Sequence, residues 1–144
     1  MRISRSLIAL GHEEGDRLSI YSFNRKEWFA CYAASYFTNG TAVGVYHTCS
    51  PDEVEWIVGN SGSKFVFVGH NPQWGRDPEK LPRNRLSKIL ESLPEVEHVI
   101  MMEDEEIIDH PIAMSWDDFM TKGDTIEESE VKDRISNIQP DSTA

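Results

Sequence analysis

Between residues 17 and 102, four short apolar segments alternate with three segments of helical periodicity. The apolar segments cover residues 17 to 23, 41 to 46, 64 to 69 and 97 to 102. Parallel strands need a long crossover, usually a helix, so this order indicates right-handed strand–helix–strand units. The pattern therefore predicts an α/β fold, with residues 17 to 102 forming a doubly wound, mostly parallel sheet with flanking helices.

Capping signals set the expected starts of two of these helices. Asn24 offers an N-cap side chain with Glu27 three residues later, and Ser50 and Glu53 repeat that spacing around Pro51. An N-cap oxygen accepts a hydrogen bond from the first turn, and proline at the first helical position sacrifices no backbone bond. We therefore expect capping boxes at both positions.

Apolar spacing predicts how the elements are buried. The helix after Asn24 carries two adjacent apolar stripes, so we expect it to be buried broadly; they are Trp28, Tyr32, Tyr36 and Phe29, Ala33, Phe37. The strand at 41 to 46 is continuously apolar, which predicts burial on both faces. Leu86, Ile89, Leu90 and Leu93 predict a helix before the fourth strand, and residues 3 to 10 predict one before the first.

The C-terminal third differs from the rest in charge. Residues 101 to 144 carry −10 of the net charge of −11, so residues 103 to 144 are expected to be acidic, more peripheral helices and a tail. Ser115 is expected to cap a short helix with Trp116 and Phe119, and a polar helix is expected from about 125 to 137. An acidic chain without a basic stripe repels phosphate backbones, which argues against nucleic acid as a partner.

The segment "GNSGSKFVFVG" at 59 to 69 has the composition of a phosphate-binding loop but not its order. Such a loop follows a strand and opens a helix, whereas this segment ends a helix and opens a strand. Gly59 and Gly62 are therefore interpreted as turn and C-cap glycines, and Lys64 as a solvated charge at the strand entry.

No complete catalytic, cofactor-binding or metal-ligating set of residues is recognisable in the sequence. Polar residues follow the strands at Asn24, at Tyr46 to Cys49 and at His70, where open parallel sheets bind ligands. His47 and Cys49 could be a base and a nucleophile, but a neutral loop role is favoured because no third group orients the histidine. The histidine spacing matches no metal motif, and Cys31 and Cys49 are expected to stay reduced in a cytoplasmic protein.

Several short motifs resemble the N-terminal region of AMP-forming acyl-CoA synthetases, the adenylate-forming superfamily. In order, they are "GDR" at 15 to 17, "NRKEW" at 24 to 28, "GVY" at 44 to 46, "SPDE" at 50 to 53 and "NSGSK" at 60 to 64. The residues Tyr46, Thr48, Ser50 and Pro51, and the segment "SWDDFM" at 115 to 120, are most similar to long-chain fatty acyl-CoA ligases of the bubblegum type.

This resemblance implies a parent enzyme that uses ATP and Mg²⁺ to convert a fatty acid to an acyl-adenylate and then transfers the acyl group to CoA. It implies that residues 1 to 144 are part of the AMP-binding N-terminal domain, cut at both ends and lacking the phosphate loop. The chain is then scaffold that binds none of these cofactors tightly. Asn24, His47 and Thr48 are the candidates for one wall of the substrate cleft.

Other functions stay open on the sequence. The parent could activate aromatic or medium-chain acids and could associate peripherally with membranes. A flavodoxin-like binding module also fits the order of strands and helices, and the acidic tail could belong to an interaction domain.

Overall fold

The structure is a computed structural model that describes residues 1–69, 77–102, 106–140 and 142. Within that part of the chain lies a five-stranded sheet in the order β2-β1-β3-β4-β5, with every neighbouring pair parallel. The strands are β1 (Arg17–Tyr21), β2 (Thr41–Val45), β3 (Phe65–Val68), β4 (His98–Met101) and β5 (Ala113–Ser115). The predicted α/β fold with a parallel sheet is confirmed.

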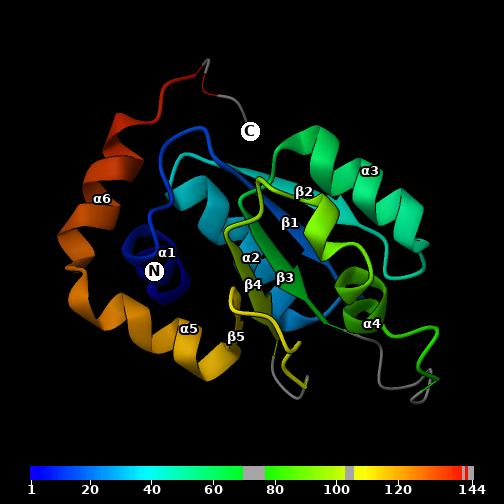
Figure 1. Ribbon diagram of the computed structural model, residues 1–144. Coiled ribbons are helices and arrows are strands. Elements are labelled where there is room, and N and C mark those ends of the chain that lie inside the picture. The colour runs from blue at the N-terminus through cyan, green and yellow to red at the C-terminus, as the bar shows by residue number, and fades with distance from the viewer. Residues whose placement is uncertain (70–76, 103–105, 141, 143–144) are drawn as a thin grey trace.

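Helices cover both faces of this sheet. They are α1 (Arg2–Ala9), α2 (Lys26–Phe37), α3 (Pro51–Ser61), α4 (Pro82–Ser87), α5 (Trp116–Lys122) and α6 (Glu128–Asn137), with short 3₁₀ turns η2 (Leu90–Ser92) and η3 (Gly123–Thr125). Figure 1 shows α3 and α4 on one side of the sheet and α1, α5 and α6 on the other. Two separate apolar cores result, one on each face.

The central strands are apolar on both faces because each face has its own helices. In β3, Phe65 and Phe67 belong to the core beneath α1, α2 and α5, whereas Val66 and Val68 belong to the core beneath α3 and α4. All four side chains are fully buried. Alternate residues of a strand point to opposite faces, so the unbroken "FVFV" run is the expected signature of a strand covered on both sides.

Local capping chemistry was predicted correctly at two of three helices. Glu53 N–H donates to Ser50 Oγ at 3.4 Å and Ser50 N–H donates to the Glu53 carboxylate at 2.7 Å, which completes the expected capping box of α3. At α5, Asp118 N–H donates to Ser115 Oγ at 3.0 Å. Both predicted caps are confirmed.

The predicted cap at Asn24 is wrong. The N-cap residue of α2 is Arg25, which makes no side-chain cap bond. Glu27, expected to complete a box with Asn24, is instead 4% exposed and paired with the Arg25 guanidinium and with Lys26 Nζ at 3.3 Å. A buried carboxylate needs a charged or hydrogen-bonding partner, and the two neighbouring cations supply it more effectively than one backbone N–H.

Two expectations about burial are also wrong. Strand β2 lies at the edge of the sheet, so Thr41, Ala42 and Val43 are half-buried and Gly44 is exposed. Helix α2 is covered on one side only, and Phe29 is 68% exposed. Both errors have the same cause. A run of apolar residues shows that a segment is able to be buried, but it does not show which other segments will pack against it.

The remaining differences concern lengths and one extra strand. Strand β5 had no sequence signal, because it has three residues that pair only with β4. Leu86, Ile89, Leu90 and Leu93 are all buried as expected, but no single long helix carries them: Leu86 lies on the six-residue α4, Leu90 on η2, and Ile89 and Leu93 flank η2. Helix α6 starts at Glu128, after η3, and not near residue 125. His70, Asn71, Trp74 and most of the acidic run at 103 to 106 lie outside the described residues.

Candidate functional site at the carboxyl edge of the sheet

Strands β1 and β2 end side by side at one edge of the sheet. Tyr21 at the end of β1 pairs in register with Val45 at the end of β2. Their following loops flank a pocket of about 220 Å³, lined by Ser22, Asn24, Trp28, Gly44, Val45 and Tyr46. In open parallel sheets this edge is where ligands bind, so the pocket is the candidate site.

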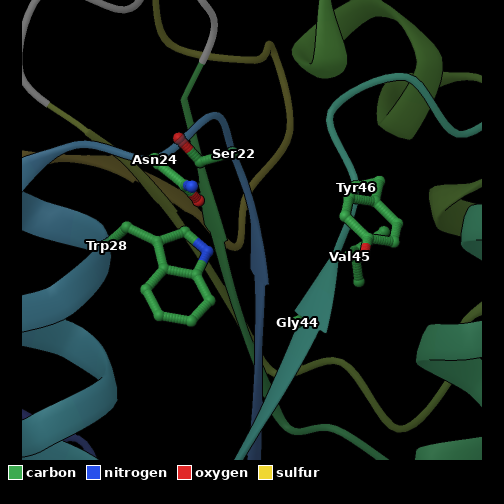
Figure 2. A pocket seen from close by; sticks show the side chains of 6 residues that line it. All are labelled: Ser22, Asn24, Trp28, Gly44, Val45 and Tyr46. Atoms are coloured by element: carbon green, nitrogen blue, oxygen red, sulfur yellow. The ribbon is translucent and has the colours of Figure 1, made fainter.

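The pocket has one aromatic wall and one open side. Figure 2 shows Trp28, on α2, on one side of the space and Gly44, Val45 and Tyr46, at and just after the end of β2, on the other, with Ser22 and Asn24 at one end. The Trp28 ring stacks on Tyr32 with centroids 5.6 Å apart and planes 16° from parallel. The Tyr32 hydroxyl in turn shares a 2.8 Å hydrogen bond with the Tyr36 hydroxyl, so Tyr32 and Tyr36 of the same helix hold the indole in place.

The absence of a side chain at Gly44 leaves space in this pocket. A Cβ added there would lie 3.6 Å from Trp28 Cζ2, an ordinary contact that would fill part of the space. Tyr46 is 80% exposed, so its ring lies at the rim. The pocket therefore offers an apolar, flat-sided space with two neutral polar groups, Ser22 and Asn24.

The loop after β2 is held in place by its backbone carbonyls. Arg85 of α4 donates from Nη1 to the carbonyls of Thr48 at 2.9 Å and Cys49 at 2.7 Å. The Tyr21 hydroxyl also donates to the Cys49 carbonyl at 3.0 Å. Thr48 itself is exposed, while its backbone carbonyl is bonded to Arg85.

His47 lies where the loops after β1 and β2 meet. Its ring packs edge-on against Phe23, with centroids 5.6 Å apart and an interplanar angle of 81°. Desolvation and, to a smaller extent, the charge of Arg85 lower the pKa of His47, so the imidazole is neutral at neutral pH. The contact joins the two loops that carry Asn24 and Thr48.

The electrostatics of Cys49 do not suit a nucleophile. Burial, and then the nearby Glu53 carboxylate, raise the pKa of the Cys49 thiol. A thiol acts as a nucleophile only as the thiolate, so Cys49 stays unreactive at neutral pH. The loop role favoured for Cys49 in the sequence is consistent with this chemistry.

The structure brings the three predicted residues to one edge but into different settings. Asn24 lines the pocket, His47 bridges the loops and Thr48 is on the outer surface. Sequence reasoning missed Ser22 and Trp28 as pocket residues. Trp28 occupies a helical position that looks like core, and only the glycine facing it at position 44 could have indicated a space.

Lys64 lies at the opposite end of the sheet from this pocket. It precedes β3, and its Nζ is 3.0 Å from the Asp16 carboxylate. The side chain is 30% exposed, so its description as a solvated charge is corrected to an ion pair between the residues preceding β1 and β3. Gly62 has φ +63 as the C-cap of α3, as expected, whereas Gly59 lies within α3. This loop has the geometry of a helix end.

In the parts of the chain that the structure describes, no three His, Cys, Asp or Glu residues gather closely enough to bind a metal ion. No helix over the same residues has the length and apolarity to cross a membrane.

Comparison with known proteins identifies the family. The family model for "AMP-binding enzyme" matches residues 1–144, the whole chain. The chain belongs to the AMP-binding enzyme family. The resemblance inferred from motifs between residues 15 and 64 is thereby confirmed over the full length.

Among curated AMP-binding enzymes, similar proteins are the long-chain-fatty-acid–CoA ligases ACSBG2 of Xenopus laevis and of Homo sapiens. Identity is 26% over 137 residues for the first and 27% over 143 residues for the second. The match covers 95% and 94% of this chain but only 17% and 19% of those ligases. The chain therefore spans about a fifth or less of the relatives' length.

Solved structures of ligases share the fold. The anthranilate CoA ligase AuaEII in complex with anthranoyl-AMP superposes with a TM-score of 0.66 at 18% identity, covering 83% of this chain and 21% of that one. A mutant form of coronafacic acid ligase from Pectobacterium brasiliense gives 0.66 at 20% identity, with 83% and 22% covered. The parallel sheet and its helices are thus a part of the larger fold of such ligases.

Proposed function

We propose that this chain acts within an ATP-dependent long-chain fatty acid–CoA ligase, which forms an acyl-adenylate and then an acyl-CoA. The observation that carries the proposal is the similarity to bubblegum-type ligases over 95% of the chain. We also propose that the ligase works in the cytoplasm, at or near the membranes that hold its fatty acid.

The contribution of these residues is a wall at the carboxyl edge of the sheet. The wall comprises Asn24, His47 and Thr48, on loops fixed by Arg85 and by the contact of His47 with Phe23. A neutral imidazole and two uncharged polar side chains suit a surface that positions a substrate without attracting a particular charge. Positioning of this kind lowers a barrier without a chemical step of its own.

The pocket does not fit the phosphates of ATP or a magnesium ion. Its lining residues carry no charged group, and the nearby Arg85 already donates to the carbonyls of Thr48, Cys49 and Glu79. Magnesium is bound through carboxylates and phosphates, and triphosphates need cations or converging N–H groups. We therefore assign the binding of ATP, Mg²⁺ and CoA to other parts of the ligase.

The test uses the complete gene product that contains these residues. ATP–pyrophosphate exchange is measured with Mg²⁺ and hexadecanoate, octanoate or benzoate as the acid. We expect kcat/KM to be at least tenfold higher for hexadecanoate. A preference for benzoate or octanoate would contradict the long-chain proposal, and absence of exchange with every acid would contradict the ligase proposal.

The wall residues are tested in the same assay. Asn24→Ala, His47→Ala and Thr48→Ala should each raise the KM for the acid several-fold, because each removes a contact with the bound acid. Thr125→Ala, another exposed threonine but in η3, is the control and should leave KM unchanged. An unchanged KM in all three variants would contradict the proposal that Asn24, His47 and Thr48 form a wall of the substrate site.

A ligase for aromatic acids is the second candidate. The aromatic wall formed by Trp28 in a pocket of about 220 Å³ suits a flat ring better than a long chain, and the similar structure of AuaEII is that of an anthranilate CoA ligase. The exchange assay with benzoate distinguishes it. The strand order β2-β1-β3-β4-β5 is also that of flavodoxin-like folds, and flavin absorbance in the purified chain would favour that module.

A further inference from the structure

An apolar furrow follows helix α2 on the outside of the molecule. One pocket of about 410 Å³ is lined by Met1 and Ile3 of the N-terminal segment, by Phe29, Ala33 and Phe37 of α2 and by Met120 of α5, among others. A second pocket, of about 210 Å³, shares Ala30 with it and is otherwise lined by Trp116 and by the charged residues Lys26 and Glu27, so the apolar part of the surface is the first pocket. We call these two adjoining pockets the α2 furrow.

The rim of the α2 furrow exposes large apolar side chains. Phe29 is 68% exposed, Phe37 is 38% exposed and Met1 is 37% exposed. Single exposed apolar residues are common, but several around one apolar hollow indicate a surface that is covered by something.

The row Phe29, Ala33, Phe37 has the form of a helix-packing ridge. Residues four apart lie on one inclined row of a helix, and such rows pack into the grooves of a partner helix. The two phenylalanines are eight residues apart, or about 12 Å along the axis. Ala33 between them and Ala30 beside them leave room for a second helix to approach closely.

We propose that the α2 furrow is the docking site of an amphipathic helix from another part of the same ligase polypeptide. This rests on the proposed function, because the ligases that the chain resembles devote more than four fifths of their length to other residues. A segment of the same polypeptide is present at high effective concentration and binds without loss of free translation.

A second copy of this chain suits the furrow less well. A two-fold dimer would bring two identical faces together. Each copy also carries a net charge of −11, which opposes self-association. The charge therefore favours an uncharged helix face from within the polypeptide.

Cysteine labelling tests the proposal. Phe29→Cys is introduced into the 144-residue chain and into the complete gene product, and the rate of reaction with a maleimide is measured. In the 144-residue chain the native thiols contribute little background, because Cys31 and Cys49 are buried and burial raises the pKa of both thiols; in the complete product, the rate without the substitution is subtracted. We expect labelling at least tenfold slower in the complete product.

The control is Trp56→Cys, since Trp56 is also 68% exposed but lies on α3, on the other face of the sheet. In the 144-residue chain both variants should react at similar rates, which calibrates the reagent. Equal labelling of F29C in the two proteins would overturn the proposal. So would a dimer of the 144-residue chain, seen by analytical ultracentrifugation and dissociated by Phe29→Glu, because it assigns the furrow to a second copy.

The outcomes separate this proposal from the proposed function. Protected F29C in a complete product without ligase activity contradicts the function and supports the docking helix. An active ligase with freely labelled F29C does the reverse.

Discussion

At the scale of single residues, His12 is a histidine buried away from water. Its side chain is fully buried against Phe65, with ring centroids 5.6 Å apart, and within the described residues neither ring nitrogen has a hydrogen-bond partner. Desolvation is the largest effect and lowers its pKa to about 4, while Asp16 raises it and Arg134 and Lys64 lower it. The imidazole is therefore neutral in the folded protein at any pH well above that value.

This predicts a loss of stability in mild acid. The pKa of His12 is about 6.5 in the unfolded chain and about 4 in the folded protein. Between these two pH values, His12 is protonated in the unfolded chain but not in the folded protein. Stability is therefore complete above the upper limit and falls as pH decreases, by at most about 3 kcal/mol. Urea unfolding of the wild type and of His12→Asn at pH 7.5, 5.5 and 4.5 measures it. The His12→Asn variant shows the pH dependence that comes from all other groups. If the free energy of unfolding changed with pH in the same way in both proteins, the effect would not come from His12.

Gly40 gives a second prediction at this scale. A Cβ at Gly40 would lie 2.5 Å from His12 Cε1 and 2.8 Å from the Asp16 carbonyl oxygen. Neither neighbour can move easily, so Gly40→Ala should destabilise the chain by about 1–3 kcal/mol. In Gly59→Ala, the control, the Cβ would meet Leu93 Cδ2 at 3.5 Å, and helix propensity favours alanine. Thermal melting should therefore drop only for G40A; equal melting points would show that the His12 pocket is loose.

At the scale of elements, the two predicted capping boxes, at Asn24 and at Ser50, should differ in how much they stabilise the protein. Ser50→Ala removes a confirmed cap and should cost about 1 kcal/mol, or about 3 °C in melting temperature. Asn24→Ala removes an exposed side chain that caps nothing, so its effect on stability should stay below about 0.5 kcal/mol. Circular dichroism melts of both variants measure this. A larger loss for N24A than for S50A would restore Asn24 as the cap.

The elements that the sequence predicts well are those with local causes. The cap of α3 depends on Ser50, Pro51 and Glu53, which are close in sequence. The burial of β3 on both faces follows from its own four apolar residues, "FVFV". The exposure of Phe29 and the pairing of β5 could not be predicted, because each depends on which distant segments lie beside it.

The same distinction applies to the candidate site. Asn24 was found by the rule that ligands bind where parallel strands end, which needs only the strand boundaries. Trp28 was assigned to the core, because its helical spacing is the same whether the ring packs against a side chain or beside a pocket. Its role follows from Gly44 on β2, sixteen positions later, being its neighbour across the sheet edge.

At the scale of the whole molecule, the five strands form a well-packed sheet, whereas the pocket at its carboxyl edge has no charged lining residue. We therefore expect the 144-residue chain to show no ATP–pyrophosphate exchange with hexadecanoate and Mg²⁺. The reason is electrostatic, because Arg85 is the cation that holds the β2 loop and already donates to three backbone carbonyls. The complete gene product, assayed at equal molarity, is the positive control. Exchange by the chain alone at more than about 1% of that rate would mean that these residues grip a triphosphate themselves, and the interpretation of this chain as scaffold would be wrong.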